Sequence, residues 1–181
     1  METIFAELNL NARLAPLDRG ELFEDPIDDI LNANDWGEVT GGGSLLSKTG
    51  EVKSCDIDFE IVPEYKEGFI EFIKCLKIIP KGSVLKIDGE EINVGVSEGL
   101  ALYLNGTDLD EEVYRNNDIN VLINQLDEAV KEIGAMYSYF EGNTETALYY
   151  YGDSFSELNA RIAIIVRNHP LCQKCRIEQI A

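Results

Sequence analysis

The residues best suited to metal or redox chemistry lie near the end of the chain, where two residues separate Cys172 from Cys175 and His169 precedes both. Together the three side chains could supply three ligands of a zinc ion. A thioredoxin-like redox pair would need its first thiol near a helix N-terminus, where the dipole lowers the thiol pKa, and these cysteines instead follow a predicted helix. The alternative is a turn with one buried thiol. We keep His169, Cys172 and Cys175 as metal candidates, but expect no metal and no cofactor.

Three acidic residues, Asp56, Asp58 and Glu60, occupy alternate positions of a predicted strand. Because side chains alternate across a strand, the three carboxylates share one face. They could bind a divalent cation, share a proton, dock a basic partner, or form a solvated surface. In a βαββαβ sheet this strand is central and the helices cover one face only. We therefore expect the acids on the open face, near Glu7.

Six aromatic residues gather in two neighbouring segments: Tyr137, Tyr139, Phe140, Tyr149, Tyr150 and Tyr151. A hairpin turn at Gly142-Asn143 would pair these segments. Strand alternation then directs Tyr149 and Tyr151 to one face and Tyr150 to the other. Exposed tyrosines are favoured interface anchors and accept Lys or Arg through cation–π contacts. Packing in a core is the alternative.

Other catalytic patterns are incomplete. Gly41-Gly42-Gly43 could cradle an anion, but no Walker Lys follows at the required spacing, so a bulge or a close backbone approach is favoured. His169 is the single histidine and stands directly before Pro170, which leaves a nucleophilic relay with one possible base. We expect no catalytic residues and a protein that is not an enzyme.

Charge is the strongest compositional signal. The chain has 34 acidic and 15 basic residues, a net charge of −19 and a pI near 4.3. The excess is distributed, with net charges of −11 for residues 1–96 and −8 for residues 97–181. Phosphate binding needs Lys and Arg, so this balance argues against nucleic acid and against an anionic membrane surface. It favours a basic protein as partner, with solubility as the alternative explanation.

Targeting and membrane signals are missing from the sequence. The first residues lack the basic and apolar regions of a signal peptide, and no apolar run approaches the roughly 18 residues of a membrane span. Without an export signal, the four cysteines are expected to be thiols. These features predict a cytoplasmic protein.

Apolar periodicity predicts the same order of elements twice. In the first half it predicts a strand at 4–10, a helix from 25 to 37, two strands within 38–61, a helix around 69–76 and a strand from 84. In the second half it predicts a strand at 100–104, a helix at 119–133, a hairpin over 136–151, a helix at 154–168 and a strand at 176–180. Both halves read β-α-β-β-α-β, as in ferredoxin-like folds. We therefore expect an α+β protein of two tandem ferredoxin-like half-units, residues 1–96 and 97–181, packed as one body.

Three stretches carry a resemblance to known proteins: RL at 13–14 leading to DRGELFEDP at 18–26, GEVTGGG at 37–43, and LCQKCR at 171–176. They resemble a family of uncharacterised bacterial proteins of about this length, a resemblance that assigns no activity or catalytic residue. In size, acidity and lack of catalytic groups the chain is also similar to immunity proteins that neutralise bacterial toxins.

These observations favour a non-enzymatic acidic binding protein, with immunity against a toxin of basic surface as its sharpest form. We expect the partner contacts at Asp56, Asp58, Glu60, Tyr137, Tyr139, Tyr149 and Tyr151. The alternative is a regulatory module that binds a small molecule where the two halves meet.

Overall fold

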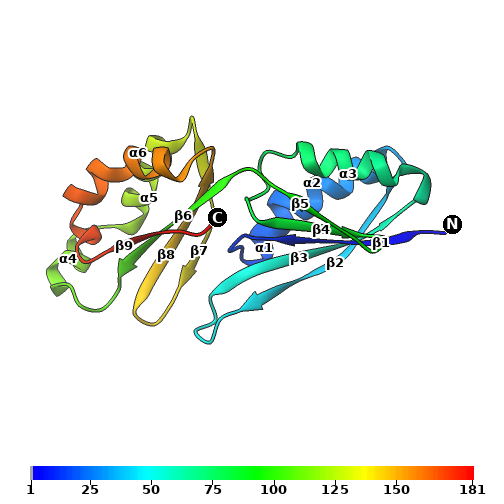
Figure 1. Ribbon diagram of the computed structural model, residues 1–181. Helices are drawn as coiled ribbons and strands as arrows, with labels where there is room; N and C mark the ends of the chain where they lie inside the picture. The colour runs from blue at the N-terminus through cyan, green and yellow to red at the C-terminus, as the bar shows by residue number, and fades with distance from the viewer. Residues whose placement is uncertain (1) are drawn as a thin grey trace. The chain divides into compact units, whose positions relative to one another are not determined.

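The computed structural model describes residues 2–181 and shows a mixed α+β protein with two antiparallel sheets (Figure 1). Contacts divide the chain into two units. The first ends at Ser97 and includes Ala181, and the second is Glu98–Ile180. No helix in the described part of the chain is long and apolar enough to cross a membrane.

The first unit has five strands and a ferredoxin-like strand order with one strand added. Its elements are β1 (Ile4–Leu10), α1 (Pro16–Arg19), the π-helical turn η1 (Gly20–Glu24), α2 (Asp25–Ala33), β2 (Gly37–Leu46), β3 (Val52–Ile61), η2 (Pro63–Tyr65), α3 (Lys66–Cys75), β4 (Ser83–Ile87) and β5 (Glu90–Val94). The sheet order is β2-β3-β1-β4-β5, with every pair antiparallel. Because β5 continues from β4 through the Asp88-Gly89 turn, this half exceeds the predicted βαββαβ pattern.

The core of the first unit lies between the sheet and its helices. Alternate residues of the two central strands are fully buried: Ala6, Leu8 and Leu10 on β1, and Cys55, Ile57, Phe59 and Ile61 on β3. Apolar side chains of the helical segments bury against them: Phe23, Ile27, Leu31, Phe69 and Ile73. Helices α2 and α3 lie on one side of this sheet (Figure 1). This one-sided covering explains why β1 and β3 alternate between apolar and polar residues.

Side chains, rather than a further strand, bind backbone groups of the edge strand β2. The Val39 amide donates to Asp28 Oδ1 at 2.8 Å. The Arg19 guanidinium donates to the Gly43 carbonyl at 2.6 Å and is itself held by Glu24 at 2.6 Å. Such contacts protect an exposed edge against pairing with another chain.

The triple glycine fits the irregular path of β2. The register against β3 shifts between Val39 and Gly41. A Cβ placed on Gly42 would lie 2.3 Å from the Asp56 carbonyl oxygen, whereas one on Gly41 would meet nothing closer than Asp58 Oδ2 at 3.9 Å. The predicted bulge or close backbone approach is confirmed, with Gly42 as the residue that requires glycine.

The second unit repeats the strand order of a ferredoxin-like sheet. Its elements are β6 (Glu98–Asn105), α4 (Glu111–Asn116), α5 (Ile119–Val130), β7 (Gly134–Glu141), β8 (Glu145–Gly152), α6 (Phe155–Asn168), η3 (Pro170–Cys172) and β9 (Arg176–Gln179). The sheet order is β7-β8-β6-β9, again antiparallel. Its core joins sheet and helix side chains: Leu100, Leu102, Leu104, Leu122, Leu126, Leu148, Tyr150, Leu158 and Ile162.

Two N-caps fix where the long helices of the second unit begin. Asp118 accepts from the Asn120 amide at the start of α5. Ser154 accepts from the Glu157 amide at the start of α6, which is one half of a capping box.

Gly42→Ala should destabilise the first unit by about 1–3 kcal/mol, because the added methyl group overlaps the Asp56 carbonyl and forces the strands apart. Gly41→Ala is the matched control, since its Cβ has room, and it should change stability far less. Urea unfolding of both variants measures the difference. Equal stabilities for the two variants would contradict the close approach at Gly42.

Candidate acidic interface

Four carboxylates of the strands β1 and β3 share the face of the first sheet opposite α2 and α3. The register places Glu7 opposite Asp58, Asn9 opposite Asp56 and Phe5 opposite Glu60. We call Glu7, Asp56, Asp58 and Glu60 the acidic face. This arrangement matches the expectation that the β3 acids lie near Glu7 on the open side.

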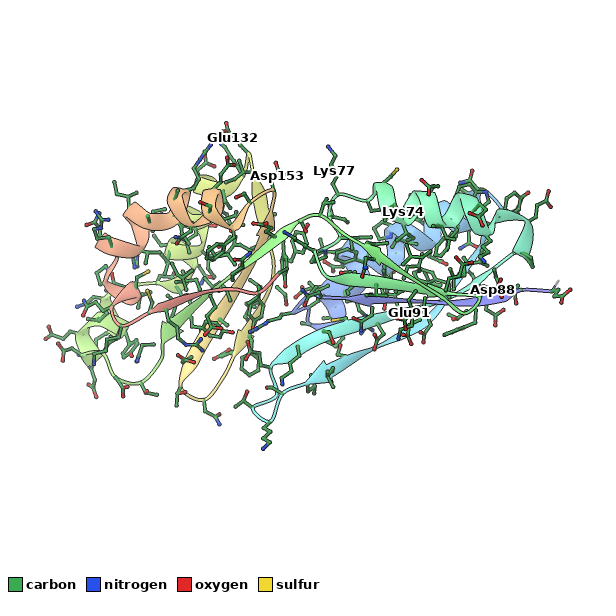
Figure 2. All side chains as sticks on the ribbon, in the orientation of Figure 1. Lys74, Lys77, Asp88, Glu91, Glu132 and Asp153 are labelled. Carbon is green, nitrogen blue, oxygen red and sulfur yellow. The ribbon has the colours of Figure 1, made fainter. Side chains whose placement is uncertain are left out.

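The acidic face continues toward β5. Lys86 pairs with Glu7 on one side and with Glu91 on the other, so all three share this face. Figure 2 shows Glu91 on the opposite side of the sheet from Lys74, which belongs to α3. The face therefore combines several carboxylates with one cation from the central strands.

Three of the four carboxylates have a partner within the first unit. Lys86 Nζ donates to Glu7 Oε1 at 2.6 Å, Asn9 Nδ2 to Asp56 Oδ1 at 2.6 Å, and Thr3 Oγ1 to Glu60 Oε2 at 2.9 Å. The Asp58 side chain has no hydrogen bond or ion pair among the described residues. Asp58 is thus the acid with most capacity left for an external cation.

The electrostatics of the face disfavour a charged Asp58. Partial burial raises the pKa of Asp58, the neighbouring Glu7 and Asp56 carboxylates raise it further, and the positive charge of Arg19 only partly opposes the rise. The hydrogen bond to Glu7 raises the pKa of Lys86, which holds that ammonium charged. Like charges directly opposite each other on paired strands destabilise a sheet. The Glu7–Asp58 pair therefore has a stability cost that an incoming cation would offset.

Neighbouring positions leave the carboxylates accessible. Gly41 lies opposite Asp58 and Gly43 opposite Asp56, so the adjoining strand places no side chain beside them. On the other side Phe5 is 58% exposed, next to Glu60. The prediction from sequence missed Phe5, although its position in the polar phase of β1, beside buried Ala6, was the signal that it points outward.

The predicted tyrosine contacts are only partly accessible, and they lie in the second unit. Tyr139 is 57% exposed, whereas Tyr149 and Tyr151 are 1% exposed each. Tyr149 and Tyr151 are thus buried in this structure, and a contact between them and a partner stays a prediction. Tyr151 stacks on half-buried Tyr137 at 4.8 Å between ring centroids, and it lies so close over Gly99 that a Cβ there would come within 2.7 Å of its ring.

The remaining hairpin aromatics have different surroundings. Burial raises the pKa of Tyr137 to about 12. Tyr150 belongs to the core and donates its hydroxyl to Asp127 Oδ1 at 3.0 Å, and burial raises its pKa strongly. Tyr139 pairs with Leu148, on the helix-covered side, so the predicted tyrosines do not form one surface.

The cysteine and histidine candidates stand close in sequence but do not form a metal site. Among residues 2–181 no group of three or more His, Cys, Asp or Glu side chains is placed to hold a metal ion. His169 Nδ1 accepts the Leu171 amide at 3.3 Å. Burial raises the pKa of Cys172 to about 12, with Cys175 adding to the rise.

A cavity in the second unit combines polar and apolar walls. It has a volume of about 360 Å³ and lies where β6, α4 and α5 meet. Apolar and polar side chains line it: Leu104, Asn105, Tyr114, Asn117, Ile119 and Thr146. Its size is within the range of small-molecule sites.

Comparison with protein-family models and with curated proteins gives no significant match. Among solved structures the chain is similar to an anthrone oxidase-like protein (12% identity, 98% of this chain and 90% of the other, TM-score 0.29). It is also similar to a proposed monooxygenase from Lactobacillus acidophilus NCFM (10%, 99% and 93%, TM-score 0.33). A mutant chlorite dismutase from Candidatus Nitrospira defluvii is also similar, with 6% identity over 99% of this chain and 92% of the other and a TM-score of 0.32. At these TM-scores the likeness carries no information on activity.

Asp58→Asn should stabilise the protein at pH 7 by about 0.2–1 kcal/mol, because it removes one of two directly opposed charges. The pKa of Asp58 is raised in the folded state, so its charge lowers stability above that pKa, and the penalty disappears as the pH falls to the ordinary value of 3.8. The gain should therefore fade in acid. Urea unfolding between pH 3 and pH 7 measures it. Glu21→Gln, which removes an exposed acid from η1, is the control, and an equal gain there would contradict a local repulsion.

Proposed function

We propose that this chain is a non-enzymatic binding protein whose acidic face docks on a basic surface of a partner protein. The observation that carries the proposal is the Asp58 carboxylate, which has no hydrogen bond or ion pair among the described residues and faces Glu7 across the strand pair. A partner Arg or Lys at this point would neutralise the repulsion that folding leaves in place. Relief of the repulsion between Glu7 and Asp58 would thus contribute to the free energy of binding.

The geometry also supplies an apolar anchor. The exposed Phe5 ring lies beside Glu60, so an Arg can pack its guanidinium on the ring while its charge meets the carboxylate. An aromatic centre with a charged rim is the arrangement in which few residues supply most of the binding energy.

Immunity against a bacterial toxin is the sharpest form of this function. Toxins that attack nucleic acid have basic active sites, because they must bind phosphate. A protein of net charge −19 with a row of carboxylates on an open sheet face suits such a site, and long-range attraction speeds the encounter. We also propose that the two units form a tandem pair of ferredoxin-like half-units, a view that their matching strand orders support.

Replacing Asp56, Asp58 and Glu60 with Asn, Asn and Gln should slow association with the partner about 10- to 100-fold at low salt, because steering by these charges is lost. The salt dependence of the association rate should flatten as well. Stopped-flow association at several ionic strengths measures both. The matched control removes three acids from the helical side of the same unit, as E21Q, D29N and E67Q, and leaves the net charge equal.

The partner itself can be sought by affinity capture with the native chain and both triple variants in parallel. The proposal expects a basic protein that the native chain and the control retain and the acidic-face variant loses. A partner that binds all three proteins with equal rates would contradict the assignment of this face.

Phe5→Ala should raise the dissociation rate of the complex at least about tenfold while leaving the association rate nearly unchanged, because truncating an anchor acts on the bound state. Stability should stay within about 0.5 kcal/mol, since the ring is exposed. Leu17→Ala, at an 81% exposed position on α1, is the control. Equal dissociation rates for both variants would remove Phe5 from the interface.

A second candidate function, a module that binds a small molecule, is favoured by the cavity in the second unit. The cavity combines apolar side chains with the amides of Asn105 and Asn117. A thermal-shift screen of metabolites tests it, because specific binding raises the melting temperature by mass action. Replacing Leu104 with Trp would fill the cavity and should abolish any such shift.

A further inference from the structure

Cys172 and Cys175 flank a tight turn that none of the functions above uses. The Cys175 amide donates to the Cys172 carbonyl at 3.2 Å, which closes a four-residue turn. Gln173 has φ −61° and ψ 135°, and Lys174 has φ 56°, as in a type II turn. Turns of this kind bring their first and last Cα atoms within about 7 Å. That separation overlaps the range of about 4.4–6.8 Å that a disulfide spans.

The two thiols differ in accessibility in a way that suits stepwise oxidation. Cys172 is 5% exposed and packs in the core of the second unit, whereas Cys175 is half-buried and packs at its edge. All four cysteines are free thiols in this structure.

We propose that Cys172 and Cys175 form a reversible disulfide that joins the turn η3 to strand β9, with a low-molecular-weight disulfide such as glutathione disulfide as oxidant. The Cys175 thiolate attacks one sulfur of glutathione disulfide and releases one glutathione. The Cys172 thiolate then attacks the Cys175 sulfur of the mixed disulfide and releases the second glutathione. Two protein thiols are oxidised, one glutathione disulfide is reduced to two thiols, and the two protons leave with the glutathione.

The bond would secure the last strand of the second sheet. Strand β9 has four residues and pairs with β6 alone. Arg176, next to Cys175, lies 3.5 Å above the Tyr103 ring and bonds Glu145 at 2.9 Å. A covalent link at Cys175 would fix the start of this strand.

The test uses the full chain in a Cys75→Ser background, because Cys75 is exposed and would form its own mixed disulfide. After equilibration with glutathione disulfide at pH 8.5, acid quenching and unfolding in denaturant, the protein should show one titratable thiol, that of Cys55, which is buried in the folded state. Trypsin cleaves after Lys174, between the two cysteines. The digest should therefore contain residues 168–174 joined by a disulfide to residues 175–176.

The pH dependence of the oxidation rate and a cysteine variant distinguish the proposed disulfide from other oxidation products. Burial raises the pKa of both thiols, so the rate should rise about tenfold per pH unit between pH 7 and pH 8.5, as the thiolate fraction rises. Cys172→Ser should instead hold one glutathione at Cys175 and give no joined peptides. Three titratable thiols after equilibration, or joined peptides that contain Cys55, would overturn the proposal.

Discussion

The antiparallel register between β1 and β3 decides which side chains of the first unit face the helices and which face solvent. With Leu8 opposite Ile57 the apolar residues of both strands meet the helices, and the same register sets Glu7 opposite Asp58 on the other face. A slip of one residue would exchange the two faces of a strand, placing carboxylates in the core. The burial of Leu8 and Ile57 therefore holds two like charges opposite each other, although that pair by itself opposes folding. The acidic face is a consequence of how the core is packed.

Strand β2 and the helical segment before it keep that face open. Two of the stretches that carry the family resemblance, residues 18–26 and 37–43, are in contact, because Arg19 binds the Gly43 carbonyl and Glu24 holds Arg19. The glycines of the second stretch have different structural roles. Gly42 lets β2 approach the Asp56 carbonyl, and Gly41 and Gly43 leave the adjoining carboxylates without a covering side chain. The motif thus explains local structure and access to the acids without any catalytic role.

Much of this arrangement could be predicted from alternation and caps. The period of two in β1 and β3 gave both the burial pattern and the stripe of Asp56, Asp58 and Glu60, because a strand with one covered face must alternate. Alternation predicts which face of a strand a side chain lies on, but not whether other residues cover that face. It therefore could not show that Tyr149 and Tyr151 are buried. Phe5 was not predicted as a surface residue, because an aromatic side chain is usually expected in the core. Only its position next to buried Ala6 in an alternating strand indicates that it faces solvent. Strand β5 and the turn at Cys172–Cys175 depend on local backbone geometry that residue type alone does not specify, as the positive φ of Lys174 illustrates.

Whether the acidic face binds cations selectively, rather than only adding to general solubility, can be tested without knowing the partner. Hexa-arginine added to ¹⁵N-labelled protein at low ionic strength will perturb amide chemical shifts wherever it binds. We expect saturable perturbations concentrated at Phe5, Glu7, Asp56 and Asp58 on β1 and β3, where the carboxylates face one another. Perturbations spread evenly over the 34 acidic residues of the chain, with no preference for these two strands, would contradict this expectation.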